Sequence, residues 1–311
     1  MTNLIKKPHE IDVQTKIKVL IYGQAGMGKS TLALSAPKPL MIDCDGGVHR
    51  VNVDHRCDTV QVESYADCLA LLKENLSAYE SIIIDTGGKL LDYMGAYIIE
   101  RNPKMGKANG SLTLQGYGER KMEFSQFCKQ VGMLNKHLIF VAHRETRTEG
   151  DNTRYVPLFG GSNYDSLVTE LDLVGYLEAN GRKRMITFDG TDRNDGKNTC
   201  NLPSMMELPN VVDGEGNGLV NAFLTESVIN PYLANLEKAK QKGEKFRELM
   251  AEIIDNIAVI TDEVSANDFI DRIDSFEHIG ASRMQAGILL SKKAKELKMK
   301  LNQQTKRYEK G

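Results

Sequence analysis

Short apolar runs alternate with helical patterns over the first two thirds of the chain. The runs with the length and composition of β-strands are Lys16–Tyr22, Pro39–Asp43, Ser81–Asp85, His137–Ala142, Leu171–Leu177 and Lys183–Phe188. Helical spacing of apolar residues is found at Ser30–Ser35, Ser64–Glu74, Leu90–Arg101 and Lys121–Leu134. The continuous isoleucines of Ser81–Asp85 are typical of a strand that is buried on both faces of a parallel sheet. The alternation predicts an α/β core with a mainly parallel sheet, and the last two runs predict a hairpin.

The pattern changes beyond about Pro209. A glycine- and aspartate-containing linker occupies Val212–Asn217, and Pro231–Gly311 has mostly helical spacing with few β-branched runs. We therefore predict two regions, an α/β core over residues 1–210 and a helical C-terminal region over residues 211–311.

A phosphate-binding pattern lies between the first strand and the first helix. Its GxxxxGK[ST] residues are Gly23, Gln24, Ala25, Gly26, Met27, Gly28, Lys29 and Ser30, with Thr31 next to them. The glycines allow backbone N–H groups to turn toward phosphate oxygens, and the start of the helix adds its positive dipole end. Lys29 is expected to reach the β- and γ-phosphates, and Ser30 to offer a hydroxyl to Mg²⁺. The segment predicts a site for ATP and Mg²⁺.

A second metal-binding group is predicted at the end of the third strand. Asp85 follows four residues of an apolar run, as the carboxylate that holds Mg²⁺ does in proteins with this loop. We expect Ser30 and Asp85 to hold the metal together.

Composition excludes several classes of protein. The chain of 311 residues has a formal net charge of −2, so nucleic-acid binding requires local basic patches. One such patch is Arg283–Gly311, with nine Lys or Arg against two Glu; a solvated helix face with a frayed tail and a nucleic-acid contact both remain open. No apolar window approaches the length that spans a bilayer, and the N-terminus has no signal-peptide pattern. Five scattered cysteines, none in a CxxC pair, predict reduced thiols and a cytoplasmic location.

Several further segments resemble RecA-type recombinases, in the same order along the chain. Asp45, after the second strand, matches the catalytic glutamate that polarises the attacking water, although it is one methylene shorter. His143, after the fourth strand, matches a glutamine that senses the γ-phosphate. The segment Glu145–Asn163, with Gly160 and Gly161 near its end, matches a DNA-binding loop. Lys197 matches the first of two lysines that act across a subunit interface.

The chain more closely resembles phage and prophage RecA-like ATPases associated with single-strand annealing recombination. The shared features are the "IYG…GKST" loop, the "Pro-Leu-x-Ile-Asp" strand, Tyr117-Gly118 and Ala142-His143, over roughly residues 16–208. The resemblance implies a RecA-like core, ATP hydrolysis on single-stranded DNA during recombination or replication, and a homo-oligomer. It also implies a recombination or single-strand-binding partner protein and, for a phage protein, the bacterial host cytoplasm. The alternatives are an ATP-dependent assembly or packaging scaffold with slow hydrolysis, and a P-loop kinase.

Two basic segments are the candidate DNA contacts. Asn102–Gly118 and Glu145–Asn163 are predicted loops after the third and fourth strands, where an open α/β sheet binds its ligands. The expected phosphate contacts are Arg101, Lys104 and Lys107 in or directly before the first segment, and Arg144, Arg147 and Arg154 in or directly before the second. Tyr155 and Phe159 are the aromatic candidates for base stacking.

Overall fold

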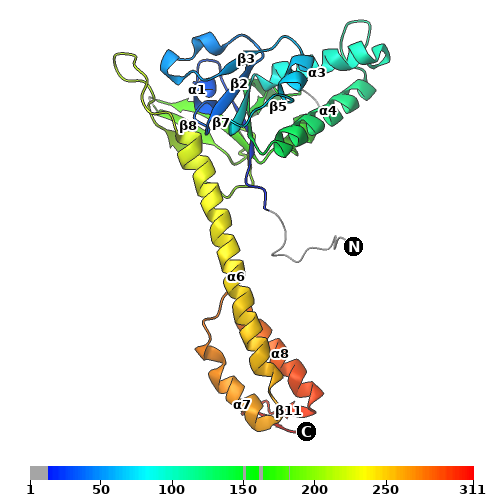
Figure 1. Ribbon diagram of the computed structural model, residues 1–311, viewed down its shortest axis with the longest axis vertical. Helices are drawn as coiled ribbons and strands as arrows, with labels where there is room; N and C mark the ends of the chain where they lie inside the picture. The colour runs from blue at the N-terminus through cyan, green and yellow to red at the C-terminus, as the bar shows by residue number, and fades with distance from the viewer. Residues whose placement is uncertain (1–12, 150–151, 161–163, 182) are drawn as a thin grey trace. The chain divides into compact units, whose positions relative to one another are not determined.

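The computed structural model describes residues 13–149, 152–160, 164–181 and 183–311 (Figure 1). Its contacts divide the chain into an α/β unit, Gln14–Leu233, and a second unit that contains Ala234–Gly311. The sequence places the boundary earlier, after residue 210, and that domain boundary stays a prediction. The N-terminal residues 1–12, which entered the signal-peptide prediction, and Gly161 lie outside the described residues.

A mainly parallel sheet forms the centre of the α/β unit. Its parallel part has the order β7-β1-β5-β4-β2-β3. The strands are β1 (Lys18–Gly23), β2 (Pro39–Asp43), β3 (Thr59–Gln61), β4 (Ser81–Asp85), β5 (His137–Glu149) and β7 (Leu173–Asn180). Antiparallel strands extend one edge, namely β8 (Lys183–Thr187), β9 (Lys197–Asn198) and β10 (Met205–Leu208). The predicted α/β class and the β7–β8 hairpin are confirmed.

Both faces of the sheet are covered, which explains its continuous apolar runs. In β1, Leu20 and Tyr22 contribute to one core, and Val19 and Ile21 to the other. The first core is completed by α2 (Tyr65–Leu71), α3 (Gly87–Arg101) and α4 (Leu114–Met133). The second contains α1 (Lys29–Ala33) and the π-helical turn Leu224–Ile229. Figure 1 shows α3 and α4 as neighbours, and they pack against each other.

Strand register brings the predicted site residues to one edge of the sheet. Gly23 lies opposite His143, and Asp43 lies opposite Asp85. All four are at the carboxyl ends of the parallel ladders, where ligands bind in open α/β sheets. Residues that are far apart in the sequence therefore meet around the phosphate-binding loop.

The first predicted loop is wrong only at its end, and the second is wrong over much of its length. In the first, α4 begins at Leu114, and Thr113 caps it by accepting a hydrogen bond from the Gly116 N–H. In the second, β5 continues to Glu149 and pairs antiparallel with β6 (Asn152–Pro157). Most residues of this ribbon are threonines and charged residues, so no alternating apolar face marks it as a strand. Cross-strand pairs stabilise such a ribbon, and Val156 near its end is buried.

The second unit is mostly helical, as predicted. It contains α6 (Asn230–Ala258) from Ala234 onward, α7 (Glu263–Arg272), α8 (Ser282–Glu296) and a small β11–β12 ladder (Met299–Leu301 and Tyr308–Lys310). Ile253, Phe269 and Ala286 are fully buried in its own core. The basic stretch is not a frayed tail, because Arg283 pairs with Asp274 at 2.6 Å and Arg307 pairs with Asp271.

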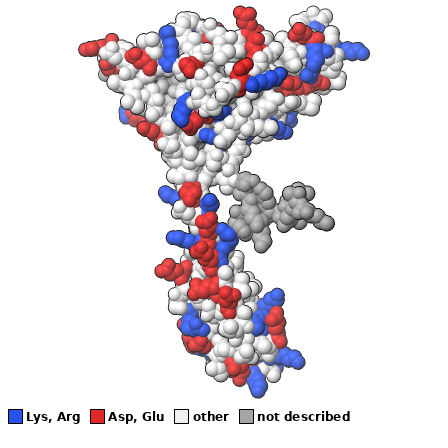
Figure 2. Space-filling model, viewed as in Figure 1, with Lys and Arg blue, Asp and Glu red and all other residues white. Residues whose placement is uncertain are grey.

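Charge is mixed over the surface. Figure 2 shows acidic and basic side chains interspersed on the visible face of the α/β unit, in line with the small net charge. Among the described residues, no helix has both the length and the apolar composition needed to cross a bilayer.

Candidate functional site

The segment Gly23–Ser30 forms a glycine turn between β1 and α1. Gly26 and Gly28 have φ angles of 79° and 83°, in the left-handed region that favours glycine. Gly28 also lies close to Arg184, since a Cβ at this position would come within 2.6 Å of the Arg184 Nη1. The strand, turn and helix start occur in the order that the sequence pattern requires.

Lys29 is folded over this loop. Its side chain is buried, and its Nζ donates a hydrogen bond to the Gln24 carbonyl at 2.8 Å. Burial lowers the pKa of Lys29, and the nearby Asp85 carboxylate opposes that shift. The ammonium is therefore incompletely compensated and well placed to receive an anionic ligand.

Asp85 lies beside Ser30 at the end of β4. Burial raises the pKa of the Asp85 carboxyl to about 6, and Asp45 and Asp43 add to the rise. A hydrogen bond from the Ser30 hydroxyl and the charge of Lys29 act in the opposite direction. Carboxylate and hydroxyl oxygens are ligands that Mg²⁺ prefers, and a buried carboxylate with acidic neighbours gains from a dication. The residues present therefore fit a magnesium ion.

Lowering the pH through about 6 should weaken Mg²⁺–ATP binding through Asp85. Because the folded-state pKa is raised, the ionised form is present above about pH 6 and is lost as the pH falls. Below that pKa, affinity should fall up to about tenfold per pH unit, since one proton competes with the metal. Calorimetric titrations between about pH 7 and about pH 5 measure this slope. Asp85→Asn is the control, because any pH dependence of affinity that remains in it comes from titration of the nucleotide itself. Equal slopes of affinity against pH in the two proteins would contradict the assignment of Asp85 as a metal ligand.

Asp45 and His143 lie in the same cavity as the phosphate-binding loop. This cavity of about 250 Å³ is also lined by Lys29, Ser30 and Asp85. The loop that carries Asp45 is held by Asp43, whose carboxylate accepts hydrogen bonds from the Gly47 and Val48 N–H groups at 2.9 and 3.1 Å. Burial lowers the pKa of His143, as do Lys29 and Arg50, while Asp45 opposes the shift. A neutral imidazole retains one N–H group that can donate to a phosphate oxygen.

Arg50 is a cavity residue that sequence reasoning missed. It ends the 3₁₀ turn Val48–Arg50 and lines the cavity together with Gly47 and Val51. No motif marks an arginine at this position, and its place shortly after Asp45 was the only signal. Arg50 is therefore a second cationic residue of the cavity wall, in addition to Lys29.

Within a single chain, Lys197 does not line this cavity. It is in β9, opposite Val174 near the start of β7, whereas the phosphate-binding loop follows the far end of β1. Its Nζ donates to the carbonyls of Val168 and Thr169 at 3.0 and 3.3 Å. The role across a subunit interface stays a prediction.

The hairpin arginines already have partners. Arg147 pairs with Glu145 at 3.1 Å, and Arg154 pairs with Asp195 at 2.6 Å. A phosphate group would have to displace an internal partner at both residues, which weakens the case for them as DNA contacts.

Arg144 connects the hairpin to the phosphate-binding loop. Its guanidinium donates to the Tyr176 hydroxyl at 2.9 Å and to the Gln24 side-chain oxygen at 3.3 Å. It also lies over the ring of Tyr155, 4.1 Å from the centroid. Tyr155 in turn stacks on Tyr176 with centroids 5.6 Å apart. Tyr155, a predicted base-stacking residue, is thus already engaged within the chain.

Phe159 is a core residue, so its predicted role in base stacking is wrong. It is fully buried, and its ring lies 5.6 Å from that of Phe124 and 5.5 Å from that of Phe140. It covers the start of α3, where a Cβ on Gly87 would come within 2.6 Å of its ring.

Phe159→Ala should lower the free energy of unfolding by about 3–5 kcal/mol, because it removes a fully buried ring and leaves a cavity. Leu158→Ala is the matched control, since Leu158 is 50% exposed and should cost much less. Chemical denaturation measures both. A loss below about 1 kcal/mol for Phe159→Ala would contradict the packing.

Comparisons with known proteins place this site in a family. A model of the AAA domain matches residues 15–200. Solved structures that are similar include the flagellar accessory protein FlaH from Methanocaldococcus jannaschii, at 10% identity over 61% of this chain and 84% of that one, with a TM-score of 0.36. A second similar structure, an ATPase domain, has 12% identity over 67% of this chain and 85% of that one, with a TM-score of 0.39. No curated protein matches.

The AAA-domain match covers more than half of the chain. It includes the phosphate-binding loop, Asp45, Asp85 and His143, which line one cavity in the structure. This chain belongs to the AAA domain family.

Proposed function

We propose that this protein is a Mg²⁺-dependent ATPase that acts on single-stranded DNA. The observation that carries the proposal is the convergence of Lys29, Ser30, Asp85 and Asp45 in one cavity at the phosphate-binding loop. A cation, two metal-binding oxygens and a further carboxylate are the groups that phosphoryl transfer to water requires.

Each of these residues has a distinct role in the proposed reaction. Ser30 and Asp85 would hold Mg²⁺, which would offset charge on the phosphates, and Lys29 would bind the β- and γ-phosphates. Asp45 accepts a proton as a water oxygen attacks the γ-phosphorus, and the bond to the β–γ bridging oxygen breaks to give ADP and phosphate. His143 donates a hydrogen bond to a γ-phosphate oxygen.

The DNA part of the proposal depends on the segment between α3 and α4. Lys104 and Lys107 are exposed there. Arg101, at the end of α3, is paired with Glu119 at 3.2 Å, so the two lysines are the more accessible contacts. The resemblance to RecA-like proteins supports a homo-oligomer. It matches the DNA-binding loop to Glu145–Asn163, so the exposure of Lys104 and Lys107 is what supports DNA contact at the segment between α3 and α4.

Replacing Lys104 and Lys107 together with alanine should lower the salt dependence of single-stranded DNA binding. If both contact phosphates, the log–log slope should fall by about 1.4, at about 0.7 per contact. Lys73→Ala/Lys129→Ala, which removes two exposed lysines elsewhere, is the matched control. Anisotropy of a labelled oligonucleotide across a salt series measures the slope, and equal slopes for both double variants would argue against this contact surface.

The proposed function is tested by ATPase rates with and without single-stranded DNA. We expect Mg²⁺-dependent hydrolysis that rises when DNA is added. ATP binding without hydrolysis, and without DNA binding at low salt, would favour the assembly or packaging scaffold instead.

A further inference from the structure

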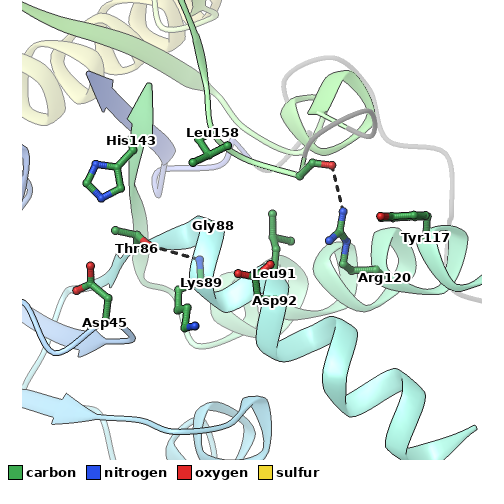
Figure 3. Close-up of a pocket in the computed structure, with 11 residues that line it drawn as sticks. Asp45, Thr86, Gly88, Lys89, Leu91, Asp92, Tyr117, Arg120, His143 and Leu158 are labelled. Atoms are coloured by element: carbon green, nitrogen blue, oxygen red, sulfur yellow. Dashed lines mark hydrogen bonds between the residues drawn. The ribbon is translucent and has the colours of Figure 1, made fainter. Parts of the chain in front are cut away.

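A larger cavity adjoins the nucleotide cavity. Its volume is about 410 Å³, and it shares Asp45, Thr86 and His143 with the nucleotide cavity. Figure 3 shows it between the start of α3, the first turns of α4 and the segment that follows β6. Volumes of about 300–1,000 Å³ are typical of ligand sites. None of the roles proposed above uses the part of this cavity that lies beyond the shared wall.

A buried arginine forms one wall of the larger cavity. Arg120 is only 7% exposed, and its Nη2 donates to the Gly160 carbonyl at 3.1 Å (Figure 3). Its Nε has no hydrogen-bond partner among the described residues. The guanidinium lies over the ring of Tyr117, 4.9 Å from the centroid. A carbonyl and an aromatic face contact this cation, and neither carries a full negative charge.

Within the described part of the chain, the contacts of Arg120 include no carboxylate at ion-pair distance. Burial lowers the pKa of Arg120, and the opposing effects of Tyr117 and Asp92 are smaller. Burying a cation of this kind is unfavourable unless an anion pairs with it. The cavity beside Arg120 has the space for such an anion.

The other charges of the cavity are closer to solvent. Lys89, in the first turn of α3, is exposed, and its Nζ lies 5.5 Å from the Tyr93 ring centroid. Asp45 and Asp92 are also exposed, so water screens their carboxylates. The buried wall is therefore cationic, and the acidic groups lie where their repulsion of an anion is weakest.

We propose that this cavity is a second anion site, which binds a phosphate-type oxyanion through Arg120, with Lys89 at its rim. The planar fork of a guanidinium matches phosphate oxygens better than it matches a monatomic ion. The oxyanion is either free phosphate or a phosphate group of a nucleic-acid strand. The site goes beyond the proposed ATPase, because it follows from the environment of Arg120 whether or not ATP is hydrolysed.

The test uses the full chain with Lys29→Ala, which suppresses phosphate binding at the nucleotide loop. Inorganic phosphate is titrated at low salt while the thermal unfolding midpoint is followed, with chloride at matched ionic strength as the reference. A second arm measures anisotropy of a labelled oligothymidylate. Arg120→Gln and Lys89→Gln are compared with Lys121→Gln, which removes an exposed charge next to Arg120.

We expect phosphate or the oligonucleotide to bind, with affinity at least about tenfold lower in Arg120→Gln, lower to a smaller extent in Lys89→Gln and unchanged in Lys121→Gln. Binding in the phosphate arm identifies the free ion as a ligand, and binding in the oligonucleotide arm alone identifies a strand phosphate. Lys89→Gln keeps the test decisive if Arg120→Gln does not fold, because its side chain is exposed. The proposal is overturned if neither probe binds, or if binding is the same in both cavity variants as in Lys121→Gln. The phosphate titration does not depend on ATP hydrolysis. A protein that binds phosphate through Arg120 but has no ATPase activity would therefore contradict the proposed function and not the second anion site.

Discussion

Lys29→Ala should weaken Mg²⁺–ATP binding by at least about a hundredfold while the protein remains folded. Removing one partner of a buried charge contact costs about 2–5 kcal/mol, and the upper half of that range corresponds to a hundredfold or more. The Lys29 ammonium is also the cation that lowers the pKa of Asp85, so its loss should raise that pKa further and weaken metal binding as well. The substitution should therefore weaken binding of both the nucleotide and the metal ion.

Isothermal titration calorimetry measures this loss, and circular dichroism shows whether the fold is intact. Lys38→Ala is the control, because its side chain is 67% exposed in an ion pair with Glu80 away from the cavity. A Lys29→Ala protein that binds ATP like the parent would contradict the assignment of the nucleotide site.

Asp45→Asn should retain Mg²⁺–ATP binding but lose hydrolysis by about 10²–10⁴-fold. An amide cannot accept a proton from the attacking water, and general-base catalysis contributes a factor of this size. Binding should be affected less, because Lys29, Ser30 and Asp85 are unchanged. Removing the Asp45 charge also removes one of the influences that raise the pKa of Asp85, which favours metal binding.

Phosphate release at saturating ATP measures the rate, and calorimetry on the same preparation measures binding. Asp192→Asn, which alters an exposed aspartate outside the cavity, is the control. If Asp45→Asn hydrolyses ATP at the parent rate, the catalytic carboxylate lies elsewhere, and Glu145 on β5 is the next candidate.

The parallel sheet and the nucleotide loop could be predicted because their signals are local. A buried parallel strand must be apolar along its length, and Ser81–Asp85 shows this without any partner being known. The phosphate-binding loop needs glycines and a lysine at fixed spacing, so its pattern is readable in eight residues. Asp85 followed from the strand that it ends.

Other parts of the fold depend on strand pairing and tertiary contacts that no local sequence pattern predicts. The β5–β6 hairpin is mostly polar on both strands, and β3 has only three residues, so neither shows an apolar alternation. The sequence around Phe159 predicts a loop, and the identity of an aromatic residue does not reveal whether three other elements bury it. Arg50 and Arg120 belong to no motif, and only the tertiary fold brings them to their cavities.

Arg144 gives the hairpin and the phosphate-binding loop a side chain in common. It contacts Gln24 at one end and the Tyr155–Tyr176 stack at the other. When ligands at two sites compete or cooperate through one shared group, their effects on each other are equal in free energy. If a ligand bound at the hairpin raises ATP affinity tenfold through this contact, ATP must raise the affinity for that ligand by the same factor. A titration of either ligand, with and without the other, would then measure the same coupling free energy.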